Sequence, residues 1–271
     1  MLTNRFGKIA GHYWHEVLSE AYSHLQVDIK NDPVAMEKLK SEILSFFSQR
    51  AKFLFGDEVS VEIEFEEGSL ITKLRIKGIA ASVIAAGMLQ YGSFRESVDY
   101  LAQDATLLAQ SANLEMIFRT KAAHCDRVRI EKRKGVFGRL DSLLSELDTV
   151  KREIKDSTMP RTSRAADGFT RATTERLLEW EKSANRLFNQ FDHDDTRACV
   201  AAGLLEELEK LPEAVPWKDE LTDSSLRSMM ANADPEGAGI IEGAATRYSA
   251  TIKSLKKLYK DAVSQYSPKS V

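Results

Sequence analysis

The stretch that decides the fold is Asp57-Glu-Val-Ser-Val-Glu-Ile-Glu-Phe-Glu-Glu-Gly-Ser-Leu-Ile-Thr-Lys-Leu-Arg-Ile-Lys77. Apolar and polar residues alternate through both of its halves, which is the period of a β-strand with one buried and one exposed face. Glu67-Gly68 separates the halves and is typical of a tight turn. The stretch therefore predicts a β-hairpin over residues 57–76.

The alternation also predicts how the two strands pair. Placing Phe65 opposite Leu70 puts the apolar side chains on one face, and the same register places Glu62 opposite Lys73 on the other. The hydrophobic pattern and the charge pattern thus favour one register. The side chains predicted to be buried are Val59, Val61, Phe65, Leu70, Leu74 and Ile76.

Helical patterns dominate on both sides of the hairpin. Apolar residues at spacings of three and four predict two helices within residues 12–50. They also predict an almost continuous helix over residues 78–134, interrupted at Gly92-Ser93. We expect the hairpin to pack against this long helix.

The second half of the chain predicts helices only. A coiled-coil-like seam starts at Leu140, and residues 156–168 are polar, contain one Pro and one Gly, and are predicted to form a linker. We therefore expect a mostly α protein. Its N-terminal α+β domain, with one β-hairpin, covers residues 1–138, and an antiparallel helical bundle covers residues 139–271.

Composition is that of a globular protein. The 271 residues are 43% hydrophobic and 29% charged, and a formal net charge of -3 gives no overall attraction to nucleic acids or membranes. The two cysteines make no disulfide framework, and no export signal follows Met1, so we expect a cytoplasmic location. The apolar run Ile79–Leu89 is shorter than the ~18 to 20 residues that span a bilayer, and contact with a membrane stays an alternative.

Two helical faces are candidates for contacts between copies of the chain. Small residues recur at three- and four-residue spacing after the hairpin and predict a close helix contact, within the fold or between subunits. These residues are Gly78, Ser82, Ala85 and Ala86. In the last helix, over about residues 240–266, a heptad-like seam is the second candidate. It includes Tyr248, Ile252 and Tyr259.

A basic segment over residues 119–139 is the candidate site for an anion or a partner. Its five central cations are Arg127, Arg129, Lys132, Arg133 and Lys134. Such a cluster suits the phosphate backbone of a nucleic acid or an anionic lipid surface. We favour pairing with the acidic face of the hairpin, with the bundle or with a partner protein.

Catalytic motifs are weak. The chain has no phosphate-binding loop, no dinucleotide-binding glycine motif and no zinc-protease or serine-hydrolase motif. His193-Asp194 resembles the dyad of HD-type phosphohydrolases, with His124 as a further candidate. His12 and His15 supply two imidazoles where a zinc site needs three or four ligands. We expect no metal and no cofactor.

One part of the chain resembles a known module. The residues are Gly68-Ser-Leu-Ile, Lys73-Leu-Arg-Ile and Tyr91-Gly-Ser-Phe-Arg-Glu-Ser-Val-Asp-Tyr-Leu. Together, residues 68–104 resemble a hairpin-plus-helix module of uncharacterised bacterial proteins, some of them in anti-phage defence loci. In that module the apolar stretch after the hairpin is longer than Ile79–Leu89. The resemblance implies a role in defence but carries no catalytic motif.

These observations predict a non-enzymatic interaction or assembly protein, which the resemblance places in an anti-phage defence system. Its partner would be another protein or a second copy of the chain. An effector that contacts a membrane or a nucleic acid, through residues 119–139 or the small-residue helix, is the main alternative. A metal-dependent helical hydrolase is the third hypothesis.

Overall fold

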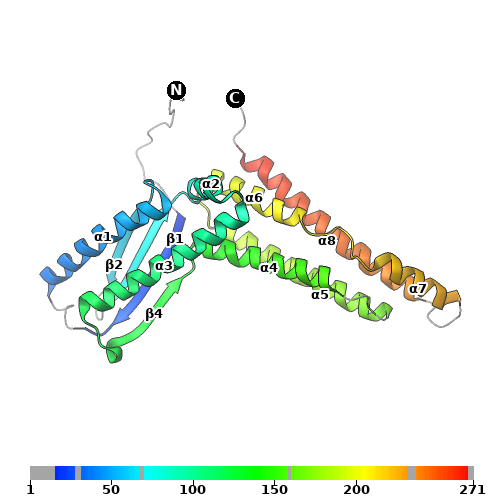
Figure 1. Ribbon diagram of the computed structural model, residues 1–271, viewed down its shortest axis with the longest axis horizontal. Helices are drawn as coiled ribbons and strands as arrows, with labels where there is room; N and C mark the ends of the chain where they lie inside the picture. The colour runs from blue at the N-terminus through cyan, green and yellow to red at the C-terminus, as the bar shows by residue number, and fades with distance from the viewer. Residues whose placement is uncertain are drawn as a thin grey trace, which may run out of the picture.

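The computed structural model describes residues 16–27, 32–66, 70–157, 160, 162–230 and 236–267. Figure 1 shows an elongated molecule, with an α/β part at one end and a helical bundle at the other. Helices make up most of the described chain, and its strands form one four-stranded antiparallel sheet. The predicted fold class, mostly α with a small N-terminal β part and a C-terminal antiparallel bundle, is confirmed.

The sheet is larger than the predicted hairpin. It contains β1 (Glu16–Leu25), β2 (Ser60–Glu66), β3 (Leu70–Gly78) and β4 (Arg127–Arg133), in the order β2-β3-β1-β4. The helix α1 (Pro33–Phe55) connects β1 to β2, and α2 (Ala80–Tyr91), α3 (Phe94–Thr120) and the short η2 (His124–Asp126) connect β3 to β4. This chain order, with every neighbouring pair antiparallel, is the split β-α-β-β-α-β, or ferredoxin-like, topology.

The predicted hairpin forms, but its register differs by two residues. Val61 lies opposite Ile76 and Ile63 opposite Leu74. A two-residue shift keeps every side chain on its own face, so the predicted apolar face still points into the core. The charged face pairs diagonally, with Lys77 Nζ 2.6 Å from a Glu62 carboxylate oxygen. The predicted turn at Glu67-Gly68 lies outside the described residues.

The first predicted helix is wrong, because residues 16–25 form the central strand β1. Apolar residues such as Leu18, Ala21 and Leu25 fit a helical spacing, but they also fit a strand with a bulge between Val17 and Ser19. Pairing with β3 on one side and β4 on the other decides the outcome, because strand formation depends strongly on cross-strand neighbours. The second predicted helix is confirmed as α1, and the Asp32 carboxylate caps it by accepting from the Val34 and Ala35 amides.

The long helix also ends earlier than predicted. The interruption at Gly92-Ser93 is confirmed: Gly92 has a φ of 88°, and the Ser93 hydroxyl accepts from the Glu96 amide to cap α3. However, α3 ends at Thr120, and residues 127–133 form the edge strand β4 instead of continuing the helix. In β4 charged and apolar residues alternate through Val128 and Ile130, which is a strand period that we interpreted as helical.

One face of the sheet carries the helices α1 and α3 (Figure 1). Buried side chains from both helices pack on the apolar side chains of the strands. They include Leu39, Ile43 and Phe47 of α1 and Val98, Leu101 and Ala105 of α3. On the opposite face, no helix within the described ranges covers the charged side chains of the strands.

The C-terminal bundle consists of α4 (Val136–Asp156), α5 (Ser163–Phe188), α6 (Asp194–Glu209), α7 (Lys218–Met230) and α8 (Gly237–Tyr266). Both α6 and α7 pack along α8. The Trp180 indole donates to the Leu143 carbonyl at 2.9 Å, which ties α5 to α4. The predicted linker over residues 156–168 is too long, because α4 ends at Asp156 and residues 163–168 already belong to α5. The connection between these packed helices covers residues 157–162, of which 158, 159 and 161 lie outside the described part.

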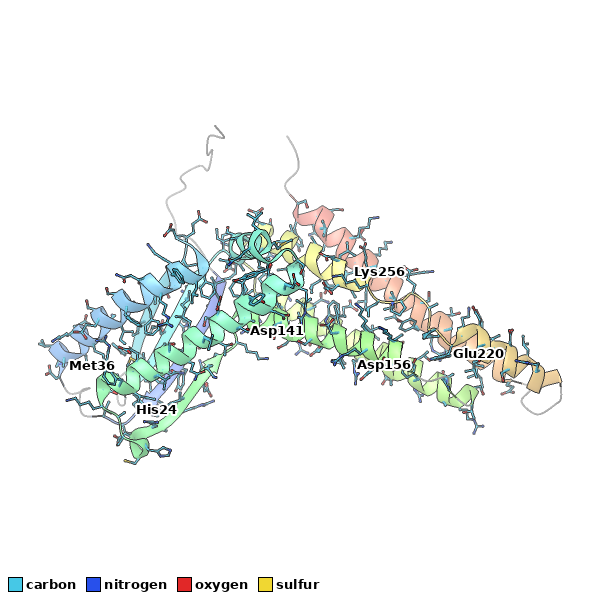
Figure 2. All side chains as sticks on the ribbon, in the orientation of Figure 1. His24, Met36, Asp141, Asp156, Glu220 and Lys256 are labelled. Carbon is cyan, nitrogen blue, oxygen red and sulfur yellow. The ribbon has the colours of Figure 1, made fainter. Side chains whose placement is uncertain are left out.

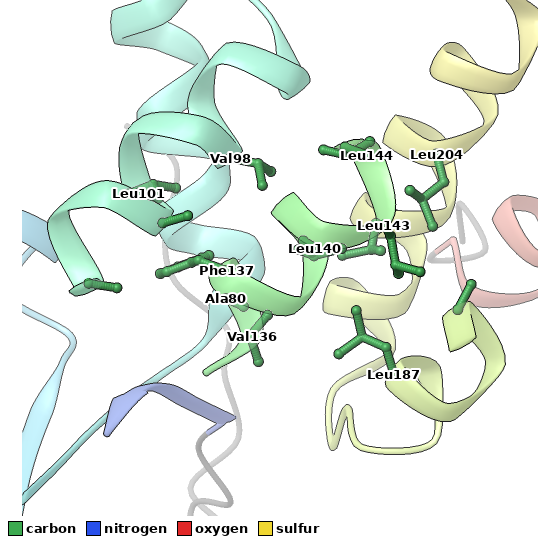
Figure 3. Packing of buried hydrophobic residues seen from close by; sticks show 14 of the residues in the cluster. Ala80, Val98, Leu101, Val136, Phe137, Leu140, Leu143, Leu144, Leu187 and Leu204 are labelled. Atoms are coloured by element: carbon green, nitrogen blue, oxygen red, sulfur yellow. The ribbon is translucent and has the colours of Figure 1, made fainter. Parts of the chain in front are cut away.

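The helix α4 belongs to both parts of the molecule. Its first turn packs into the α/β part, where the Phe137 ring lies 5.8 Å from the Phe55 ring. Figure 3 shows Phe137 on the side of Leu101, and Leu143 on the side of Leu187. The predicted domain boundary between residues 138 and 139 thus falls within the first turn of a continuous helix. No helix in the described ranges has the length and apolar character needed to cross a membrane.

Candidate functional site

The uncovered face of the sheet is built from ion pairs. Glu20, in the middle of β1, accepts from Arg75 of β3 and from Arg133 of β4, each at 2.7 Å. Burial of the Glu20 carboxyl opposes its ionisation, but the hydrogen bonds from the two guanidiniums outweigh burial and hold its pKa below the ordinary value. Glu20 therefore joins three of the four strands through charge.

Arg129 and Arg133 of β4 are neutralised within this face, whereas Arg127, at the start of the strand, is exposed. Arg133 also donates to Glu131 at 3.0 Å, Arg129 pairs with Glu131, and both guanidiniums lie over the Tyr22 ring. Arg129 and Arg133 are thus paired within the chain, but not with the acidic face of the hairpin or with the bundle, as we predicted. The acidic partners differ, because they come from β1 and β4, whereas the acids of the hairpin pair with cations of β3.

Two lysines of the same segment lie at a cavity on the helix side. This cavity, which we call the α3/α4 cavity, has a volume of about 550 Å³ and lies between α3, the end of β4 and the start of α4. The Lys132 Nζ lies 3.3 Å from the Gln110 side-chain oxygen, and the Lys134 Nζ lies 2.7 Å from the Ser142 hydroxyl. Both partners are neutral, and neither lysine has a carboxylate of the described residues within ion-pair distance.

Two carboxyl groups also line the α3/α4 cavity. Asp99 of α3 and Asp141 of α4 both line it, and Figure 2 places Asp141 at the start of the bundle. The Arg95 guanidinium lies between them, 3.3 Å from Asp99 and 3.6 Å from Asp141. Burial, together with a hydrogen bond to Asp141, raises the pKa of Asp99 despite Arg95. The cavity is thus lined by two ammonium groups and two carboxyl groups.

A second surface is apolar and lies on the outside of the helix layer. A groove of about 470 Å³ between α1 and α3 has Phe46 and Phe53 on one bank and Leu107 on the other. Phe53 is 88% exposed and Leu107 is 60% exposed. Further along α3, Leu114 and Phe118 are also exposed. We call Phe46, Phe53, Leu107, Leu114 and Phe118 the outer α1/α3 surface.

A carboxyl group lies in the same groove. Asp104 of α3 lines it together with Arg50 of α1. Burial raises the pKa of Asp104 above its ordinary value. The groove is therefore mainly apolar, with one polar position between its banks.

The predicted small-residue face does not form as a helical face. Gly78 ends β3, where an added Cβ would lie 3.0 Å from Val59 and 3.1 Å from Leu18. The other three residues of that face are exposed on α2, whose buried side is formed by different residues. The exposed residues are Ser82, Ala85 and Ala86. Their contact with another subunit stays a prediction.

The predicted C-terminal seam is a core within the bundle. Tyr248 and Ile252 are fully buried, and Tyr259 is 2% exposed. The Tyr248 hydroxyl donates to the Pro212 carbonyl at 2.7 Å, and the Tyr259 ring lies 5.6 Å from the Trp180 ring. The prediction that these residues contact a second chain is therefore corrected to a contact inside one chain.

The candidate hydrolase residues do not come together. His193 and Asp194 begin α6, and Asp194 pairs with Arg197 at 2.7 Å. His124 lies in η2 beyond the C-terminal end of α3, a helix of 27 residues and roughly 40 Å in length. Within the described ranges, no group of three or more His, Cys, Asp or Glu side chains could hold a metal ion. His12 and His15 lie outside these ranges.

The outer α1/α3 surface was missed at the sequence level, although a signal existed. Tyr100, Leu107 and Leu114 recur every seven residues, on the opposite side of α3 from the buried stripe through Val98 and Leu101. A second apolar stripe on a helix that is already buried on one side predicts a further contact.

Comparison of the chain with models of protein families, with curated proteins and with solved structures finds no match.

Proposed function

We propose that this chain is a non-enzymatic assembly protein that pairs with a second copy of itself through the outer α1/α3 surface. The observation that carries the proposal is the exposure of Phe53 and Phe118, at 88% and 77% of their surfaces, beside an apolar groove. Soluble monomers rarely expose contiguous apolar patches of this kind, and larger patches mark interaction sites.

The size of the helix layer suits a dimer. The helices α1 and α3 have 23 and 27 residues, so they are roughly 35 and 40 Å long. Two neighbouring helices present a face about 20 Å wide. The resulting area of roughly 700 Å² per copy is close to the ~800 Å² that each partner buries in a standard interface.

The geometry also supports a self-complementary contact. In a two-fold dimer the same patch is used on both copies, and each apolar bank meets a groove of the other copy. Here the groove and its apolar banks belong to one surface, with Phe53 on α1 and Leu107 on α3. The pairing would bury aromatic and aliphatic side chains at the centre, where binding energy concentrates in interfaces.

The bundle would then act as an arm of fixed direction. The helix α4 runs without a break from the α/β part into the bundle, and Phe94 of α3 packs on Gly203 of α6. A dimer formed through α1 and α3 would hold two such arms in a defined relation. The resemblance of residues 68–104 to a module of anti-phage defence loci makes such a system the setting that we propose.

The test is the mass of the full chain in solution. We expect sedimentation equilibrium between about 1 and 100 μM to show a monomer–dimer equilibrium. Phe53→Ser and Leu107→Ser should each weaken it about tenfold or more, because each removes ~1.5 to 3 kcal/mol of apolar burial. Leu258→Ser is the matched control, because Leu258 is exposed on α8. The proposal would be refuted by a chain that is monomeric at every concentration. It would also be refuted by a dimer whose dissociation constant is unchanged in both variants.

A membrane-contacting effector is the second candidate, and one observation favours it. The exposed side of α2 is apolar, with Leu89 92% exposed and Met88 and Ala85 beside it. Such a helix could lie on a lipid surface. Cosedimentation with vesicles of anionic lipid that is lost in Leu89→Ser would support this function, and a chain that stays in the supernatant would remove it.

A further inference from the structure

The α3/α4 cavity is hollow because small residues line it. Ala102, Ala105 and Ala109 of α3 face Gly138 of α4 across the space. Larger apolar side chains at these positions would fill it, as they fill the rest of the core. Its volume of about 550 Å³ lies within the range of small-molecule sites, roughly 300 to 1,000 Å³.

The lysines that line the cavity favour the binding of an anion. Lys132 and Lys134 line it, and their ammonium groups are hydrogen-bonded only to the neutral oxygens of Gln110 and Ser142. Arg133, the residue between them, also borders the cavity, but its guanidinium is neutralised by Glu20 and Glu131. Two ammonium groups without carboxylate partners beside a concave surface form a phosphate-binding arrangement.

The start of α4 also favours the binding of an anion. Gly135 and Gly138 of its first turn line the cavity, and the turn has no acidic residue and no side-chain cap. Amide groups at a helix N-terminus donate to anions, and the helix dipole favours negative charge there. Gly135 is needed for this placement, because a Cβ on it would overlap the Leu18 carbonyl of β1.

The carboxyl groups that line the cavity restrict the kind of anion that fits it. Asp99 and Asp141 accept hydrogen bonds and repel negative charge. A nucleic-acid backbone, which carries a phosphate at every nucleotide, would meet these carboxylates as well as the lysines. A molecule that carries one phosphate and also hydroxyl or amino groups matches both kinds of lining group, with the alanines against its apolar part.

We propose that the α3/α4 cavity binds a phosphorylated small molecule of the nucleoside monophosphate class. Its phosphate lies between Lys132, Lys134 and the first turn of α4, and its hydroxyl or amino groups donate to Asp99 and Asp141. The cavity lies between α3, the end of β4 and the start of α4, and Leu107 lines both the cavity and the groove of the outer α1/α3 surface. Lys132 and Lys134 line the cavity and not that groove, so variants of the lysines test this site apart from the proposed assembly.

The probe is adenosine monophosphate, measured by titration calorimetry with the full chain at about 0.15 M salt. We expect saturable binding of one molecule per chain. The double variant Lys132→Gln/Lys134→Gln should bind at least about tenfold more weakly, because it removes two charge-assisted hydrogen bonds. Arg127→Gln is the matched control: it removes a cation of the same segment that does not line the cavity, and its affinity should stay within about twofold.

Two further measurements locate the ligand without relying on the lysines. Ala102→Leu fills the cavity and should abolish binding of adenosine monophosphate, with the melting temperature as a check of folding. In the unaltered chain, the amide resonances of Gly135 and Gly138 should shift on titration, whereas that of Gly239 in α8 should not. Binding that survives Ala102→Leu, or that leaves both glycine amides unmoved, would overturn the site.

Further titrations distinguish a small phosphorylated molecule from a nucleic acid or a lipid surface. Adenosine without phosphate should bind at least about tenfold more weakly than the monophosphate. A 5′-phosphorylated oligonucleotide and vesicles that contain phosphatidic acid test the polymer and the lipid surface. If either binds at the cavity while adenosine monophosphate does not, the small-molecule class is wrong.

Discussion

The two parts of the molecule use their apolar residues in opposite ways. In the bundle, heptad-spaced side chains such as Ile252 and Tyr259 are buried within one chain. In the α/β part, α3 has a buried stripe and a second, exposed stripe that includes Leu107 and Phe118. The heptad seam of the bundle is therefore buried within one chain, whereas the α/β part exposes apolar side chains, which we propose as the contact with a second copy.

The largest expected effect tests the bundle side of this comparison. Trp180 is 1% exposed, packs on Tyr259 and donates to Leu143. Trp180→Ala should lower the free energy of unfolding by about 3 to 5 kcal/mol, because it leaves a cavity at the centre of the bundle. Denaturant unfolding measures the loss. Leu178→Ala, at a position 43% exposed on the same helix, is the control. A loss of unfolding free energy in this control as large as that of Trp180→Ala would contradict the assignment of the core.

The junction between the two parts gives the next effect. A Cβ on Gly203 would overlap the buried Phe94 ring, so Gly203→Ala should cost about 1 to 3 kcal/mol by overpacking. The same substitution at Gly168 in α5, where an added Cβ meets no atom within 4 Å, should stabilise the helix by about 0.5 to 1 kcal/mol. Thermal unfolding of both variants gives the signs. A Gly203→Ala variant that is as stable as the unaltered chain, or more stable, would show that α6 does not pack on Phe94 as described.

These outcomes bear on how much of the fold the sequence could predict. The helices of the bundle were predictable, because seven-residue spacing of large apolar side chains such as Leu140 and Leu147 has one structural solution. The strand β1 was not, because its residues fit a helix equally well and only pairing with distant strands decides between the two. The strand β4 has a strand period through Val128 and Ile130, which we interpreted as helical. Without these strands the ferredoxin-like topology could not be recognised.

The candidate sites were also predictable only in part. The basic segment was identified from its residues, but the strand period of β4 was needed to divide it into Arg129 and Arg133 on one face and Lys132 and Lys134 toward the cavity. The carboxylates Asp99 and Asp141 lie 42 positions apart in the sequence and were not predicted to meet. Their approach depends on how α4 crosses α3, which no local pattern encodes.

A smaller effect, which depends on pH, tests the charged face of the α/β part. Because the pKa of Glu20 is lower in the folded chain than in the unfolded chain, its contribution to stability is present above the ordinary pKa of about 4.3 and is lost as the pH falls through the lowered value. Glu20→Gln should cost about 1 kcal/mol at pH 7. The difference from the unaltered chain should shrink in acid. Denaturant unfolding at pH 7 and at about pH 3 compares the unaltered chain with Glu20→Gln. A stability difference that grows in acid would contradict the lowered pKa of Glu20.

The central claim is that the α/β part, and not the bundle, presents the surface for a second copy. The most direct measurement compares leucine methyl resonances of the full chain as its concentration rises from about 10 μM to 1 mM. Leu107 and Leu114 lie on the outer α1/α3 surface, and Leu178 and Leu258 are exposed on the bundle. The account predicts that the first pair shifts with concentration and the second pair does not. Shifts confined to Leu178 and Leu258, or no shift at any of the four, would contradict it.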